Sequence, residues 1–193
     1  DVRSADVTVL VGERGVNKTF VFKGIHTHPY DGFAEAEFFD VRGLQQAVAA
    51  SMEAVEHSLG SNIREIYVGV PGEFCKVATR RHLMSFQSKR RISAADVAEL
   101  FDNGYTEPVP AYTLIRRSAV FYVTSDKRRT IDPVGMVSDS LEGYLSYFLA
   151  SDRFIGTLRN ILSEYGVKKV HFLPTSLAEA LYLIPSEARD EYA

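Results

Sequence analysis

The chain has 193 residues, 46% of them hydrophobic, which is enough to bury the core of one large domain or two small ones. Its 22 basic and 25 acidic side chains give a net charge of -3, so it lacks the electrostatic signature of a general nucleic-acid-binding protein. No apolar run is long enough to span a membrane as a helix. The single cysteine, Cys75, cannot form an internal disulfide, so a reducing, cytoplasmic setting is expected.

The first part of the chain predicts an antiparallel hairpin. Valine stands at every second position from 7 to 11, which predicts a strand that ends at Gly12. Residues 19–27 (TFVFKGIHT) predict a second strand, and Gly15 and Asn17 between the two suit a tight connection. A turn at 28–32 and a short extended segment at 34–39 follow.

One long amphipathic helix and one buried strand are expected next. Asp40 can cap the helix at its start, and Gly60 suits a left-handed cap at its end. The apolar stripe of this helix has residues at intervals of three or four: Val41, Leu44, Val48, Met52, Val55 and Leu59. Residues 66–70 (IYVGV) then form an apolar run without polar alternation, which predicts an interior parallel strand buried on both faces.

The middle of the chain predicts an inserted block with the order strand, helix, strand, strand. The strands are expected at 76–86, 112–124 and 141–150, and the helix begins at Ser93, where Asp96 completes a capping box. After the block come an amphipathic helix at 152–165, a strand within 167–173 and a final helix after Pro174. Without the block, the remaining order is that of a ribonuclease-H-like or actin-like α/β core.

The ribonuclease-H-like order raises a nuclease function first, since two-metal nucleases need converging carboxylates at strand ends. Asp1, Glu53 and Glu56 are the candidate ligands, but the central strand ends in Val70-Pro71-Gly72 with no acid. Charges on a helix face are usually solvated, so the nuclease function is disfavoured. His26 and His28 lack the further ligands of a metal site. Composition and spacing alone predict no complete active site.

Three stretches resemble FtsA, the actin-like family of bacterial cell-division proteins. The first runs from Asp31-Gly32-Phe33 to Tyr67-Val68-Gly69-Val70 and resembles the family's first subdomain. The second, Asp132-Pro133-Val134-Gly135-Met136, resembles a turn of its inserted subdomain. The third, Pro174 to Ala180 (PTSLAEA), resembles the segment after its last strand of this half. The order and spacing agree over essentially the whole chain.

The resemblance implies a division into subdomains and a nucleotide site. Residues 1–76 and 151–193 would form subdomain 1A, with its first strand largely missing, and residues 77–150 would form the inserted subdomain 1C. The family's first phosphate loop would fall on residues 1–4, with Asp1 and Ser4 as the cofactor-binding residues for ATP and Mg²⁺. Arg3 replaces the glycine that lets the backbone approach a phosphate, so this chain is expected not to bind ATP in the ordinary way.

The resemblance also implies partners and a place of action. The family tethers FtsZ to the membrane and recruits other divisome proteins at the cytoplasmic face of the inner membrane. The FtsZ contact and the C-terminal membrane helix would belong to a half not present here, whereas residues 77–150 could support self-association. No nucleic-acid partner is expected. The alternatives are a pilus-assembly protein of the PilM kind and another nucleotide-binding enzyme of the actin superfamily, such as a sugar kinase.

Overall fold

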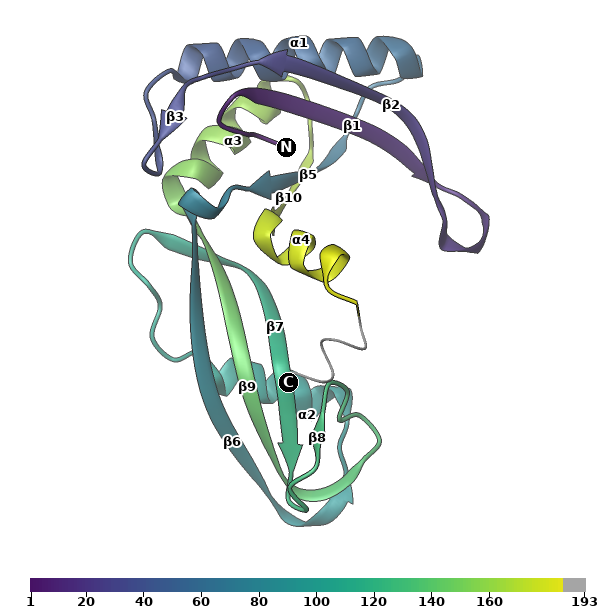
Figure 1. Cartoon of the computed structure of the whole chain (residues 1–193), viewed down its shortest axis with the longest axis vertical. Helices are drawn as coiled ribbons and strands as arrows, with labels where there is room; N and C mark the ends of the chain where they lie inside the picture. Colours follow the sequence, from purple (N-terminus) through teal and green to yellow (C-terminus); the bar gives the residue numbers. More distant parts are fainter. Residues whose placement is uncertain (186–193) are drawn as a thin grey trace. The chain divides into compact units, whose positions relative to one another are not determined.

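The computed structural model describes residues 1–185 and contains helices and strands in two compact units. The first unit comprises residues 1–74 and 151–175 (Figure 1). The second comprises residues 75–150 together with the described residues that follow Thr175. The predicted final helix is present as α4, Thr175–Leu183. The stretch 186–193, which we expected to belong to the first subdomain, lies outside the described residues.

The first unit begins with the predicted hairpin. Strand β1, Asp6–Arg14, pairs antiparallel with β2, Phe20–Pro29, and the register shifts once between Val11 and Gly12. A short 3-10 turn, Val16–Lys18, connects them, and Asn17 adopts φ 60° within it. Asparagine tolerates this left-handed conformation better than most side chains, which accounts for its place in the turn.

Helix α1, Val41–Leu59, packs on this hairpin (Figure 1). The Asp40 carboxylate accepts a hydrogen bond of 2.8 Å from the backbone N–H of Gly43, and Gly60 ends the helix at φ 66°. Both predicted caps are therefore confirmed. The apolar stripe is buried from Leu44 to Val55, whereas Val41 is 45% exposed and Leu59 is half-buried.

Strands β5, Glu65–Val70, and β10, Lys169–Pro174, form a parallel pair, and α3, Asp152–Glu164, precedes β10. Helix α3 buries the five apolar residues expected of it: Phe154, Ile155, Leu158, Ile161 and Leu162. The expectation that β5 is buried on both faces is wrong, because Tyr67 is 62% exposed. Only the face of this strand that carries Val68 and Val70 is buried.

A cluster of phenylalanine rings joins distant parts of the first unit. Two very short strands, β3 (Phe33–Ala34) and β4 (Glu37–Phe38), form a tight hairpin that replaces the expected extended segment. The ring of Phe38 stacks on that of Phe74 at 4.9 Å between centroids, and Phe74 in turn contacts Phe154 at 4.8 Å in a tilted arrangement. Aromatic pairs at such distances add stability beyond the area they bury.

Residues 75–150 of the second unit form a four-stranded sheet with helix α2 on one face. Its strands are β6 (Cys75–Arg91), β7 (Tyr112–Thr124), β8 (Arg129–Thr130) and β9 (Val137–Ser151), in the order β6-β9-β7-β8. Helix α2, Ala94–Gly104, covers the core formed by Ile92, Leu100, Phe101, Tyr122, Leu141, Leu145 and Tyr147. The predicted order strand, helix, strand, strand is confirmed. Strand β7 has the predicted bounds, β6 and β9 are longer than expected, and β8 was not predicted.

Several arginines of the second unit are engaged in ion pairs. Arg117 lies 2.6 Å from the carboxylate of Asp102. Arg81 pairs with Glu142 on the neighbouring strand. In residues 1–185 no helix is both long and apolar enough to cross a membrane.

Candidate functional site

The carboxyl ends of β5 and β10 are the place in the first unit where a ligand would be expected. Ligands of open α/β sheets commonly bind beyond the carboxyl ends of the parallel strands. Strand β5 ends at Val70 and β10 at Pro174, and Thr175 follows directly. The hydroxyl of Thr175 donates a hydrogen bond of 3.0 Å to the carbonyl of Val70, which ties the two ends together.

Asp1 reaches these strand ends. A methyl group added at Gly69 would lie 2.9 Å from Asp1 Oδ1 and 2.7 Å from the Cγ2 of Thr175, so only glycine fits between them. Of these residues, only Asp1 was predicted from the sequence; Gly69 and Thr175 were not. The parallel pairing of two apolar runs that end at Val70 and Pro174 is the signal that could have found them.

Arg3 and Ser4 lie in the bend between Asp1 and β1. The guanidinium of Arg3 contacts the Asp6 carboxylate through Nε at 2.8 Å and Nη2 at 2.7 Å. Its Nη2 also donates to the hydroxyl of Thr8 at 3.1 Å. Ser4 is exposed. The Arg3 charge is therefore compensated within the bend, and the loop brings an arginine, not a glycine, beside Asp1.

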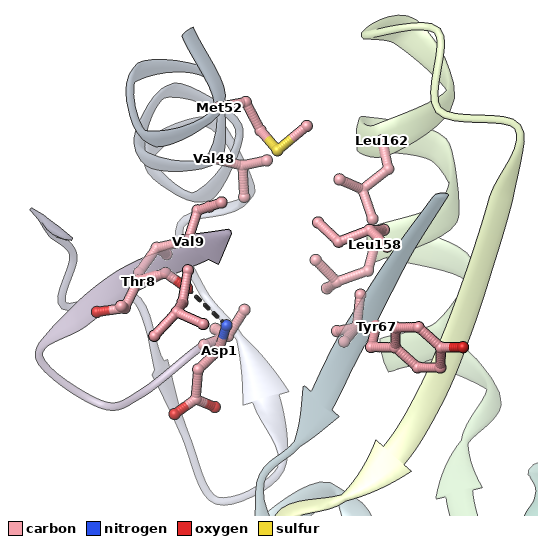
Figure 2. A pocket seen from close by; sticks show the side chains of 13 residues that line it. Asp1, Thr8, Val9, Val48, Met52, Tyr67, Leu158 and Leu162 are labelled. Atoms are coloured by element: carbon pink, nitrogen blue, oxygen red, sulfur yellow. Dashed lines mark hydrogen bonds between the residues drawn. The ribbon is translucent and has the colours of Figure 1, made fainter. Parts of the chain in front are cut away.

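A hollow lies beside Asp1, between β1 and β5 (Figure 2). The α-amino group of Asp1 donates a hydrogen bond of 2.7 Å to the carbonyl of Thr8 on its rim. Burial, followed by the nearby charge of Arg3, lowers the pKa of this amino group. Side chains from α1 and α3 line the inner side: Val48, Met52, Leu158 and Leu162. The hollow is thus apolar inside and polar at the end that Asp1 occupies.

The other candidate ligands do not join Asp1 at this site. Glu53 is exposed on α1, and Glu56 accepts a hydrogen bond of 2.6 Å from the backbone N–H of Ile63, which stabilises the turn after the helix. His26 lies 3.4 Å from the hydroxyl of Ser51. Among residues 1–185 no group of three or more His, Cys, Asp or Glu side chains could hold a metal ion.

A second polar group lies on the exposed face of the parallel pair. His171 Nε2 is 2.8 Å from the Glu65 carboxylate, and its ring stacks on Tyr67 at 4.7 Å between centroids. His171 and Tyr67 are directly opposite each other in the strand register, which explains the stacking. The spacing of histidines in the sequence carried no signal for this contact, because it depends on the pairing of the strands.

The second unit presents an open sheet face opposite α2. Tyr144 of β9 stacks on Phe121 of β7 with ring centroids 4.3 Å apart. The guanidinium of Arg81 lies 5.6 Å from the Tyr144 ring, and that of Arg129 lies 4.9 Å from the Phe121 ring. Leu83, two residues from Arg81 on the same face, is 56% exposed. We call these five residues the aromatic–arginine face.

Comparisons with known proteins bear on the fold. No family model matches the sequence, and no curated protein matches it. A chain of a solved structure described as the PilM-PilN type IV pilus biogenesis complex is similar, with a TM-score of 0.57 and 9% sequence identity. The alignment covers 94% of this chain and 48% of that chain, so the present chain spans about half the length of this neighbour. At this identity the likeness concerns the fold alone. The expected mixed α/β class is confirmed by the helices and strands of the structure.

Proposed function

We propose that this chain is the first half of an actin-like assembly scaffold of the FtsA kind, which acts through protein–protein contacts of its second unit. The aromatic–arginine face is the observation that carries the proposal. Tyrosine and arginine are enriched at the centres of protein interfaces, where flat rings and planar guanidinium groups bury large areas at low entropic cost. In this face they lie next to one another, with exposed Leu83 beside them.

The remaining assignments follow from this proposal and from the resemblance to FtsA. Under it, residues 1–76 and 151–193 form subdomain 1A and residues 77–150 form subdomain 1C. The loop at Asp1 and Ser4 is the remnant of a phosphate loop for ATP and Mg²⁺. FtsZ and other divisome proteins are the partners of the complete protein, at the cytoplasmic face of the inner membrane, and self-association takes place through residues 77–150.

A pilus-assembly scaffold is the second candidate function. The observation that favours it is the likeness in fold to a chain of the PilM-PilN complex over 94% of the present chain. The turn Asp132-Pro133-Val134-Gly135-Met136 favours the cell-division scaffold. Both functions require partner contacts, so the same experiment distinguishes them.

Site-specific photo-crosslinking in the native bacterium tests the proposal. A photoreactive amino acid replaces Leu83 on the aromatic–arginine face, and Glu99, exposed on α2, is the matched control position. We expect adducts with division proteins or with a second copy of the chain from position 83 and not from position 99. Adducts with pilus-assembly proteins would instead establish the second candidate. If position 83 gives no adduct beyond those of position 99, this face is not the contact surface and the proposal fails.

A further inference from the structure

Strand β6 is the outer strand of the sheet in the second unit. The strand order β6-β9-β7-β8 gives it a neighbour on one side only within residues 1–185 (Figure 1). It is 17 residues long, and none of these residues is buried. Unpaired strand edges expose rows of backbone donors and acceptors that readily bind another strand. Strand β6 therefore offers a long edge for pairing.

The regular part of this edge runs from Val77 to Ser85. Over this stretch each residue of β6 has a partner on β9, from Val77 opposite Phe148 to Ser85 opposite Ser140. After Ser85 the register shifts, and residues 86–89 have no partner on β9. That irregularity interrupts the edge. The stretch before it has a length within the usual range for a strand.

A side chain shows which backbone groups of β6 point outward. The Nη1 atom of Arg80 donates a hydrogen bond of 3.0 Å to the carbonyl of Thr79 on the same strand. The guanidinium thus occupies the place where a neighbouring strand would donate. Inward and outward residues alternate along an antiparallel strand, so Thr79, Arg81 and Leu83 present their N–H and C=O groups to the open edge. In the described part of the chain, the backbone from Val77 to Ser85 forms hydrogen bonds with β9 alone.

The charge of β6 indicates which kind of strand fits this edge. The strand contains six Lys and Arg residues and no Asp or Glu. Arg81 and Arg90 have carboxylate partners in the chain, whereas Arg80 is exposed and has none among residues 1–185. A second copy of β6 would bring like charges opposite one another, which is destabilising. The edge therefore favours a strand with acidic side chains.

The two faces of the edge differ. Arg80 is opposite Leu145, which belongs to the core beneath α2, so Arg80 and His82 lie on the α2 side of the sheet. Val77 and Leu83 lie on the other side and are 53% and 56% exposed. Side chains of neighbouring strands meet on the same face. A strand beside β6 would thus contact basic side chains on one face and apolar side chains on the other.

We propose that the edge of β6 binds an extended peptide in which acidic and β-branched apolar residues alternate, as a fifth strand of the four-stranded sheet. Its backbone pairs with Thr79, Arg81 and Leu83, and its alternate side chains give the specificity. Acidic side chains pair with Arg80, which then releases the Thr79 carbonyl to the incoming strand. The inference rests on the proposed function and deepens it, because Arg81 and Leu83 also belong to the aromatic–arginine face.

Two labelled peptides of equal composition test the proposal with the full chain. The first, SEVEVEVES, alternates glutamate and valine, and the second, SEEEEVVVS, separates them into blocks. Fluorescence polarisation measures the affinity, and hydrogen exchange by NMR reports on the edge. We expect the alternating peptide to bind about tenfold more tightly. It should slow the exchange of the Thr79 and Arg81 amides about tenfold, while the Arg80 amide, which faces β9, stays unchanged.

Arg80→Glu provides a test within the protein. Reversal of this charge should weaken binding of the alternating peptide about tenfold, because an attraction becomes a repulsion. Arg116→Glu is the matched control, since it makes the same charge change at an exposed position of β7 and should leave the affinity unaltered. Equal midpoints of thermal unfolding show that both variants are folded.

Several results would overturn the proposal. They are no binding of the alternating peptide, equal binding of the two peptides, unchanged exchange of the Thr79 and Arg81 amides at saturation, or an equal loss of affinity in Arg116→Glu. The proposed function fails separately, through the absence of specific adducts at position 83. Adducts at that position without protection of the β6 amides would keep the aromatic–arginine face as a contact surface and refute the added strand.

Discussion

Arg90 and Asp96 form a two-pronged ion pair at the start of α2. The guanidinium Nη1 and Nη2 atoms lie 2.8 and 2.6 Å from the two carboxylate oxygens. The same carboxylate accepts a hydrogen bond of 2.7 Å from the backbone N–H of Ser93, and the Ser93 hydroxyl caps the helix in return. Strand β6, which ends at Arg91, is thereby joined to the helix that covers the core of the second unit.

Asp96→Asn is expected to destabilise the protein by about 1–3 kcal/mol, because it removes a charge-assisted pair and half of a capping box. Arg90, followed by the bonds from Ser93, lowers the pKa of Asp96. A carboxyl with a lowered pKa in the folded state stabilises the protein above its unfolded pKa, near 3.8, and this contribution is lost as the pH falls below that value. Urea unfolding at neutral and acidic pH measures the difference.

The control for Asp96→Asn is Glu99→Gln on the exposed side of the same helix, which should change the free energy of unfolding by less than about 0.5 kcal/mol. The difference between the Asp96 variant and the parent chain should shrink toward acidic pH. A difference that is constant between neutral pH and the acid limit would contradict the ion pair as its cause.

Tyr147→Phe is expected to cost about 1–2 kcal/mol. The hydroxyl of Tyr147 is buried and donates a hydrogen bond of 2.8 Å to the carbonyl of Phe101, which lies in the last turn of α2. Carbonyls of a last turn have no partner within the helix, so the variant leaves a buried acceptor unsatisfied. Thermal unfolding measures the loss. Tyr182→Phe, at a side chain exposed to 89%, should leave stability unchanged.

Gly60→Ala and Gly156→Ala should shift stability in opposite directions. Gly60 ends α1 at φ 66°, where a Cβ costs about 1 kcal/mol. Gly156 lies within α3, where an added Cβ has no heavy atom within 4 Å, so alanine should stabilise by about 0.5–1 kcal/mol. Chemical denaturation of both variants gives the two signs. Equal signs would contradict the backbone argument.

Stability should fall in alkaline solution partly through Tyr30. Burial, followed by the charge of Asp40, raises the pKa of Tyr30 to about 12. Its hydroxyl donates a hydrogen bond of 3.1 Å to the carbonyl of Asp40. A raised folded pKa means that this stabilisation is complete below pH 10, the unfolded value, and is lost as the pH rises toward about 12. Tyr30→Phe should flatten the alkaline fall in the unfolding midpoint, and an unchanged fall would refute the assignment.

Mg-ATP is expected not to bind this chain with micromolar affinity. In the proposed phosphate loop, Arg3 would take the place of a glycine that lets the backbone approach a phosphate. Its guanidinium is held by Asp6 and Thr8. Isothermal titration calorimetry checks this, with Arg3→Gly as the companion variant. Micromolar binding to the parent chain would show that the arginine is compatible with a phosphate site.

The helices were predictable because their evidence is local. The stripe from Leu44 to Val55 and the caps Asp40 and Gly60 lie within one segment, so their spacing in the sequence is enough to place α1. The same holds for the capping box of Ser93 and Asp96. The hairpin of β3 and β4 was missed because Glu35 and Ala36 adopt φ values of 51° and 61°, which neither residue type favours.

The site was only partly predictable because it depends on strand pairing. Asp1 could be selected from the resemblance, but its approach to Gly69 and Thr175 follows from the positions of β5 and β10, which sequence periodicity does not give. The exposure of Tyr67 has the same origin. An apolar run predicts two covered faces, whereas the covering depends on which elements pack against the strand.

The segment 75–150 begins and ends at neighbouring points of one sheet. Cys75, the first residue of β6, is directly opposite Ala150 of β9 in the antiparallel register. Two chain ends that are already side by side require no long connection, so the 76 residues from Cys75 to Ala150 form a compact insertion. Such an insertion can be deleted and replaced by a tight turn between residues 74 and 151. It can also be inserted into a turn of another protein without separating the two strands that the turn joins.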